Sequence, residues 1–173
     1  MPKILFVCHG NICRSPMAEF VMKEMVSKCT DSRCADFEIA SAATSTEEIG
    51  NPVYPPARRM LASHGISCSG KTARQMTLRD YEYYDYIVLM DRNNLRNLRW
   101  ILPSEIYEKE CAANTAHPCA GNGKVSLLMD WTGNSRDVAD PWYTGDFEAT
   151  WNDVNAGCRA MLEQLLTRTA PGA

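Results

Sequence analysis

The 173-residue sequence has no long apolar run, no excess of positive charge and no signal-peptide pattern. A membrane-spanning helix needs about 20 apolar residues, whereas the apolar run near the start covers only Ile4 to Val7. The 18 Lys and Arg are outnumbered by 21 Asp and Glu, so no basic surface is expected to hold a nucleic acid. We therefore expect a cytoplasmic monomer without a membrane or nucleic-acid partner.

The chain has eight cysteines, yet it lacks the secretory context in which a disulfide framework usually forms. We therefore expect most of them to be reduced thiols. The stretch from Pro103 to Lys124 holds Cys111, His117 and Cys119. A structural zinc site needs a full set of ligands at tighter spacing, so the sequence predicts no metal and no cofactor.

Short apolar runs alternate with amphipathic stretches along the whole chain. Strands are predicted over 4–7, 37–41, 86–90 and 125–129. Helices are predicted over 16–29, 56–64, 77–83 and 92–102, and after the capping residue Asp146. This alternation indicates an α/β fold: a single three-layer domain over 1–173, with a four-stranded parallel sheet and helices on both faces. The stretch 103–124 is predicted to be an elaborated surface loop.

A turn-rich segment joins the first strand to the first helix, and its sequence is Cys8-His9-Gly10-Asn11-Ile12-Cys13-Arg14-Ser15. Ligands of open parallel sheets bind beyond the carboxyl ends of strands, and a helix N-terminus attracts anions. The segment is therefore predicted to be a phosphate-binding loop, in which the Arg14 guanidinium binds two phosphate oxygens. The same positive environment favours a nucleophilic thiolate at Cys8. Gly10 and Asn11 suit left-handed backbone angles, and Ser15 is expected to cap the helix and donate to the Cys8 sulfur.

Hydrolysis of a phosphate ester also needs an acid that protonates the leaving group. The candidate is Asp140, because Pro141 after it favours an extended loop. Trp142 and Tyr143, next along the chain, can flank an aromatic substrate ring. The rival acids are Asp130, Asp137 and Asp146.

These residues resemble the low-molecular-weight protein tyrosine phosphatases across nearly the whole chain. The most specific match is VCHGNICRSPMAE, and SHGI, TARQM, YIVLMDRNNLRNL and ADPWY follow in the family's order. The resemblance implies hydrolysis of phosphotyrosine, in a protein or a small aryl phosphate, through a cysteinyl-phosphate and without a metal. It implies that Cys8 is the nucleophile, Arg14 the phosphate ligand and Asp140 the general acid. The other phosphate-binding positions would be His9, Gly10, Asn11, Ile12, Cys13 and Ser15.

The resemblance also implies supporting roles. The residues that would stiffen the loop by hydrogen bonds are Asn11, Ser15, Glu19 and Ser41. Asp91 would orient the loop's surroundings, and Trp142 and Tyr143 would form an aromatic wall beside the substrate. Cys13 would form a reversible disulfide with Cys8 that shields it from irreversible oxidation.

Two regions depart from the family's pattern. Lys71 stands where the family's network often has a histidine. The segment 42–48 often supplies an aromatic residue to the pocket, but here it ends in Glu47 and Glu48. These acids are predicted to line the substrate wall and to disfavour acidic peptide substrates.

Three alternatives stay open. An arsenate reductase of the same fold would need a further cysteine pair near the middle of the chain, where only Cys68 lies nearby. Phosphoarginine phosphatases resemble this loop but carry threonine where Ile12 stands. A non-catalytic redox or phosphate-binding module would use Cys8 and Cys13 but would not need Asp140.

Overall fold

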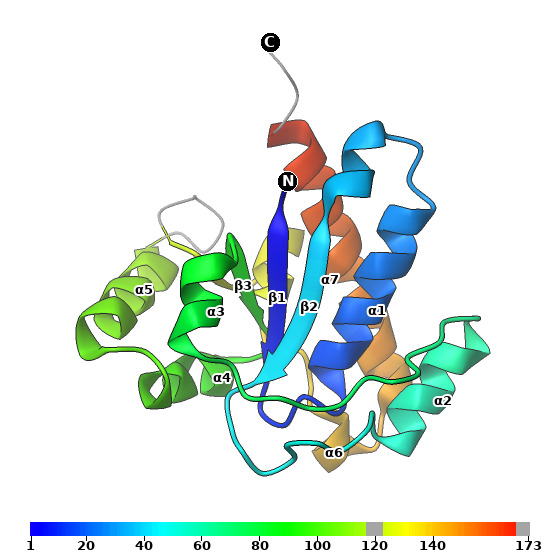
Figure 1. Cartoon of the computed structure of the whole chain (residues 1–173), viewed down its shortest axis with the longest axis horizontal. Helices are drawn as coiled ribbons and strands as arrows, with labels where there is room; N and C mark the ends of the chain where they lie inside the picture. The colour runs from blue at the N-terminus through cyan, green and yellow to red at the C-terminus, as the bar shows by residue number, and fades with distance from the viewer. Residues whose placement is uncertain (117–122, 169–173) are drawn as a thin grey trace.

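A four-stranded parallel sheet forms the centre of the molecule (Figure 1). The computed structural model describes residues 1–116 and 123–168. Within these ranges the strands are β1 Lys3–Cys8, β2 Glu38–Ala43, β3 Tyr86–Leu89 and β4 Val125–Leu127. Their order across the sheet is β2-β1-β3-β4, and all neighbours are parallel. The predicted α/β fold with a parallel sheet is confirmed.

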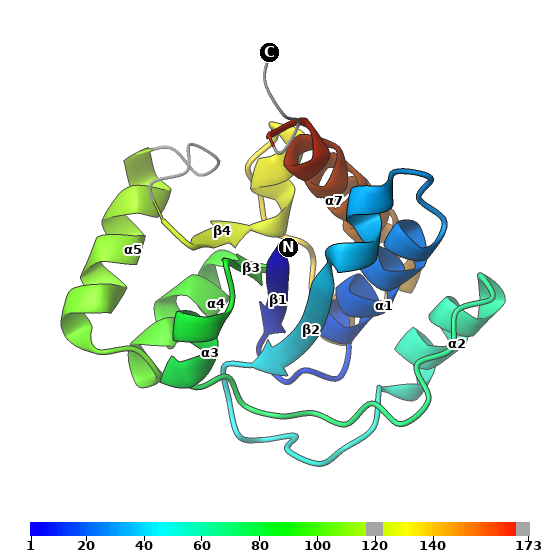
Figure 2. The ribbon, with the colours of Figure 1, turned by 45° about the horizontal axis from the view of Figure 1, so that its top comes forward.

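Helices cover both faces of the sheet (Figure 2). One face is covered by α1 Arg14–Ser27, α2 Pro55–Ser63 and α7 Phe147–Arg168. The opposite face is covered by α3 Leu78–Tyr83, α4 Arg92–Asn97 and α5 Ser104–Ala116. Shorter helical segments are η1 Ser32–Asp36, η2 Leu98–Trp100, η3 Leu128–Thr132 and α6 Pro141–Thr144.

Strand β1 runs through the middle of the sheet and contributes to both cores. Ile4 and Phe6 belong to the core under α1 and α7, whereas Leu5 and Val7 belong to the core on the opposite face. This division arises because successive side chains of a strand point to opposite sides of the sheet. The last residue of the strand, Cys8, therefore leaves the sheet at its carboxyl edge, where ligands of such sheets bind.

The prediction of a surface loop over 103–124 is wrong for its first part, which is α5. The helix buries a polar face that includes Glu110 and Asn114. The Glu110 carboxylate accepts hydrogen bonds from the Tyr81 hydroxyl (2.5 Å) and from the backbone N–H groups of Lys124 and Val125 (3.2 Å each). Because the buried face is polar, apolar periodicity does not reveal this helix.

The expectation that most cysteines are reduced holds within the described residues, where one pair is the exception. Cys8, Cys13, Cys68, Cys111 and Cys158 are not disulfide-bonded. Cys29 and Cys34 form a disulfide, because the chain reverses after α1 and brings their Cα atoms to 6.2 Å. His117 and Cys119, which were considered as metal ligands, lie outside the described residues.

Residues 1–116 and 123–168 contain neither a metal-binding cluster nor a membrane-spanning helix. In that part of the chain no cluster of His, Cys, Asp and Glu side chains is arranged to hold a metal ion. No helix in the same part of the chain is both long enough and apolar enough to cross a membrane.

Candidate active site

The loop from Cys8 to Arg14 joins the end of β1 to the start of α1. Asn11 has a φ of +58° and is the one non-glycine residue with positive φ in the described ranges. The prediction of left-handed backbone angles is therefore confirmed for Asn11 but is wrong for Gly10. Glycine suits position 10 for another reason: a Cβ there would lie 3.2 Å from Cγ of Glu48.

Ser15 does not cap α1 as predicted, because the helix begins two residues earlier, at Arg14, and its N-cap is Cys13. The Ser15 side chain is instead fully buried behind the loop, with its Oγ 3.0 Å from Cys8 Sγ. Asn11 Nδ2 donates to Ser15 Oγ (2.9 Å), and the Asn11 backbone N–H donates to the Cys8 sulfur (3.3 Å). The loop thus directs a backbone donor and a hydroxyl toward the sulfur.

A chain of hydrogen bonds continues behind the loop. Asn11 Nδ2 donates to Ser41 Oγ (2.8 Å), which donates to Glu19 Oε2 (2.5 Å). Lys71 completes this chain: its Nζ lies 3.0 Å from Glu19 Oε2 and donates to the Ser41 carbonyl at 3.0 Å. The Arg74 backbone N–H donates to Asn11 Oδ1 (3.2 Å). The structure therefore joins the supporting residues with Lys71, which occupies the place of the expected histidine.

Burial and charge act in opposite directions on the Glu19–Lys71 pair. Burial raises the pKa of the Glu19 carboxyl, but hydrogen bonds from Lys23 and Ser41 and the charge of Lys71 hold that pKa below its usual 4.5. Burial lowers the pKa of Lys71, and the attraction of Glu19 offsets only part of this. Glu19 is therefore an anion at neutral pH.

Arg14 is buried at the other side of the site and is held by two carboxylates. Its Nη1 donates to Asp91 Oδ2 (2.6 Å) and to the Val138 carbonyl (2.9 Å), and its Nη2 donates to Asp140 Oδ2 (3.0 Å). Burial lowers the pKa of Arg14, but the charges of Cys8, Asp91 and Asp140 outweigh it, so the pKa is raised overall. The guanidinium stays charged and fixed in orientation.

Asp140 is both a turn residue and a neighbour of Arg14. As the N-cap of α6, its Oδ1 accepts the backbone N–H of Trp142 (3.0 Å), while Oδ2 accepts from Arg14. The rival acids bond elsewhere: Asp130 accepts from the Leu127 N–H, Asp137 from the Arg92 N–H and Asp146 from the Ala149 N–H. Asp140 alone of the four lines the cavity described next.

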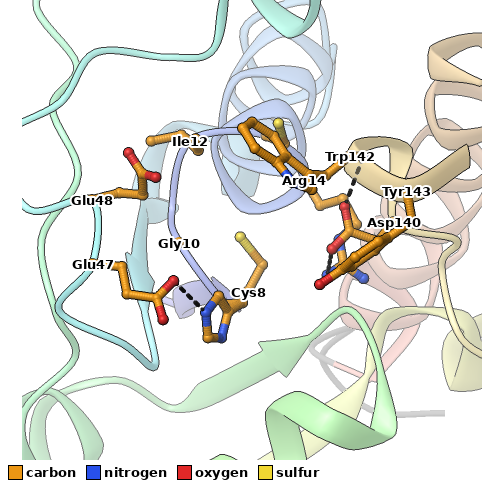
Figure 3. A pocket seen from close by; sticks show the side chains of 11 residues that line it. Cys8, Gly10, Ile12, Arg14, Glu47, Glu48, Asp140, Trp142 and Tyr143 are labelled. Atoms are coloured by element: carbon orange, nitrogen blue, oxygen red, sulfur yellow. Dashed lines mark hydrogen bonds and ion pairs between the residues drawn. The ribbon is translucent and has the colours of Figure 1, made fainter. Parts of the chain in front are cut away.

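A cavity of about 280 Å³ opens over the loop (Figure 3). The loop contributes Cys8, His9, Gly10, Ile12, Cys13 and Arg14 to its lining. Asp140, Trp142 and Tyr143 form one wall, and Glu47 and Glu48 lie across the opening from them. The cavity lining does not include four buried residues: Asn11, Ser15, Ser41 and Asp91.

Three contacts made by residues of the cavity lining were not predicted from the sequence. The ring of Tyr54 lies 5.0 Å from that of Trp142, and its backbone N–H donates to the Ile12 carbonyl (2.8 Å). The imidazole of His9 lies 3.0 Å from the Glu47 carboxylate. Tyr54 follows the segment in which an aromatic was sought, and only the fold brings it against Trp142.

The two loop cysteines lie in different electrostatic environments. Burial, together with the negative charges of Cys8 and Asp140, raises the pKa of the Cys13 thiol to about 12. Cys13 therefore stays protonated at neutral pH and is a poor nucleophile. The Cys8 sulfur, in contrast, accepts the Asn11 backbone N–H and lies 3.0 Å from the Ser15 hydroxyl.

Comparison with known proteins gives consistent matches over most of the chain. Residues 3–170 match the family model described as low molecular weight phosphotyrosine protein phosphatase. The chain is 34% identical to low molecular weight protein-tyrosine-phosphatase YfkJ of Bacillus subtilis, covering 95% of this chain and 96% of that protein. It is 37% identical to the human low molecular weight phosphotyrosine protein phosphatase, covering 94% of each. The crystal structure of YfkJ superposes with a TM-score of 0.81 over 98% of this chain and 97% of that one.

Proposed function

The chain belongs to the low molecular weight phosphotyrosine protein phosphatase family, a family of hydrolases, and we propose that it hydrolyses phosphotyrosine through a phosphocysteine on Cys8. The observation that carries the assignment of roles is the cavity itself. It brings the Cys8 sulfur and the Arg14 guanidinium, from the two ends of one loop, together with the Asp140 carboxyl at the start of α6. A nucleophile, an anion ligand and an acid are the groups that phosphoryl transfer needs.

In the first step the Cys8 thiolate attacks phosphorus and the bond from phosphorus to the phenolic oxygen breaks. Arg14 and the loop N–H groups bind the equatorial phosphate oxygens, where negative charge accumulates. The bound phosphate takes over Arg14 Nη2, which in this structure donates to Asp140. Asp140, in its protonated form, gives its proton to the leaving phenolate.

In the second step a water attacks the phosphorus of the phosphocysteine. Asp140, now a carboxylate, accepts the proton of this water, and the bond from sulfur to phosphorus breaks. The Cys8 thiolate leaves, assisted by the Ser15 hydroxyl 3.0 Å away and the Asn11 N–H at 3.3 Å. Inorganic phosphate is released, and the enzyme returns to its starting state.

We also propose that Cys13 protects the nucleophile. A peroxide would oxidise Cys8 to a sulfenic acid, which would condense with the Cys13 thiol to a disulfide and release water. A thiol reductant would then restore both cysteines. Because this chemistry needs reduced thiols, we propose that the enzyme is cytoplasmic. We also propose that it acts as a monomer and, in keeping with its net charge of −3, does not bind nucleic acid.

A substrate panel tests the substrate class. The reduced protein is assayed on one peptide carrying phosphotyrosine, phosphoarginine or phosphoserine. We expect the highest kcat/KM on phosphotyrosine, with Ile12→Thr shifting the preference toward phosphoarginine. A wild-type preference for phosphoarginine, or thioredoxin-dependent turnover of arsenate in place of ester hydrolysis, would overturn the assignment.

A further inference from the structure

An aromatic wall and an acidic wall face each other across the cavity. Trp142 and Tyr143 are exposed on one side of the opening, and Glu47 and Glu48 lie on the other, with Cys8 between them (Figure 3). A substrate whose phosphate reaches the Cys8 sulfur must pass between these walls. The groups that flank its phosphotyrosine will therefore lie near the two glutamates.

The first glutamate is held at the rim by contacts with the loop. Glu47 Oε2 lies 3.0 Å from His9 Nε2, and the Glu47 backbone N–H donates to Ser45 Oγ (3.4 Å). Ser45 in turn donates from Oγ (2.9 Å) and from its backbone N (3.1 Å) to the His9 carbonyl. The carboxylate of Glu47 is therefore positioned next to the nucleophile's own loop.

The second glutamate rests on the loop at another point. Glu48 Cγ lies 3.2 Å from the position that a Cβ on Gly10 would occupy, and Glu48 Oε2 accepts from Asn51 Nδ2 (2.6 Å). This partner is a neutral amide, so the negative charge of Glu48 is not balanced by it. Within 1–116 and 123–168 neither glutamate accepts a hydrogen bond at Oε1, which leaves an acceptor oxygen on each for a substrate group.

The positive charge of Arg14 does not neutralise this acidic wall. Arg14 is buried and already faces Asp91 and Asp140. In the mechanism proposed above it also binds the substrate phosphate. The entrance to the cavity is therefore negative, while its floor binds an anion.

We infer that Glu47 and Glu48 select phosphotyrosine sites flanked by arginine or lysine and reject sites flanked by acidic residues. This inference rests on the proposed function. A single exposed ion pair contributes little binding free energy, but here two acids face several charges that flank the phosphotyrosine. The comparison between the two peptides also includes both the attraction of the basic one and the repulsion of the acidic one. We expect a preference on the order of 10-fold in kcat/KM at low salt, which weakens as added salt screens the charges.

The test uses two phosphotyrosine peptides that differ only in carrying arginine or glutamate on either side of the phosphotyrosine. The kcat/KM ratio is measured for the wild type, Glu47→Gln, Glu48→Gln and the double variant. Glutamine keeps the size of each side chain and removes its charge. Glu163→Gln on the exposed side of α7 is the matched control.

We expect the wild type and Glu163→Gln to prefer the arginine peptide, and the double variant to bring the ratio close to one. A wild-type ratio of one or less, or an unchanged ratio in the double variant, overturns the inference. If the wild type still hydrolyses p-nitrophenyl phosphate, the proposed function survives that result. If turnover is too slow to measure, the ratio of the two peptides' Kd values for Cys8→Ser decides the inference by the same criteria.

Discussion

Lys71 Nζ lies 3.0 Å from Glu19 Oε2 behind the loop from Cys8 to Arg14, where the two side chains are 13% and 5% exposed. The same ammonium donates to the Ser41 carbonyl at 3.0 Å. A lysine thus takes the place of the family's frequent histidine and still completes the network.

Lys71→Met tests the contribution of this pair. The substitution leaves the buried Glu19 carboxylate with one fewer cationic partner, so we expect a loss of about 1–3 kcal/mol in unfolding free energy. Urea denaturation measures it. Lys28→Met is the control, because Lys28 is exposed and pairs with Glu24 on the surface of α1. Equal effects of the two substitutions would contradict the structural role of Lys71.

The pKa of Glu19 predicts how stability depends on pH. Its pKa in the folded protein lies below the usual 4.5, so its ionisation stabilises the fold above about pH 4.5. That contribution is lost as pH falls through the folded-state pKa. The difference in unfolding free energy between wild type and Glu19→Gln should therefore be larger at about pH 7 than at about pH 3. A difference that is independent of pH would contradict the assignment.

Asn11 combines a left-handed backbone with a side chain that holds the loop. Asn11→Ala removes hydrogen bonds to Ser15 and Ser41 and strains the φ of +58°. Asn11→Gly removes the same side chain but relieves the strain. We expect both variants to bind phosphate more weakly, and the alanine variant to be less stable by about 1 kcal/mol. Calorimetric binding and thermal unfolding measure the two effects, and equal stability of the two variants would contradict the strain.

The central part of the site could be predicted because it is continuous in sequence. Cys8, Arg14 and the loop between them lie at the junction of one buried strand and one helix, so a local pattern identifies them. The contacts of this loop with distant segments could not be predicted from such a pattern. Lys71 meets Glu19, and Tyr54 meets Trp142, only because the fold brings the segments on either side of α2 against α1 and α6.

The elements and contacts that differ from the predictions also have physical causes. The helix α5 was missed because its buried face carries Glu110 and Asn114, which satisfy backbone and side-chain groups rather than filling an apolar core. The disulfide between Cys29 and Cys34 depends on a chain reversal after α1 that composition does not reveal. Ser15 was expected to cap a helix, but the loop uses its hydroxyl at the Cys8 sulfur.

Asp140 should matter most for substrates with a poor leaving group. We expect Asp140→Asn to lower kcat/KM, which reports the step that releases the phenol, by about 10²–10⁴-fold for a phosphotyrosine peptide, and to lower it less for p-nitrophenyl phosphate, whose phenolate leaves without a proton. Steady-state rates on both substrates measure the difference. Asp137→Asn is the control, since Asp137 lies outside the cavity. An equal loss on both substrates would show that Asp140 is not the acid.

The most direct test of the whole account is the rate of p-nitrophenyl phosphate hydrolysis by Cys8→Ser under reducing conditions. Cys68→Ser serves as the matched control, because Cys68 is a buried thiol outside the cavity. If Cys8 forms the phosphoenzyme, Cys8→Ser should lose turnover by at least about 10³-fold, while Cys68→Ser should keep the activity of the wild type. Near-normal turnover by Cys8→Ser would contradict the account.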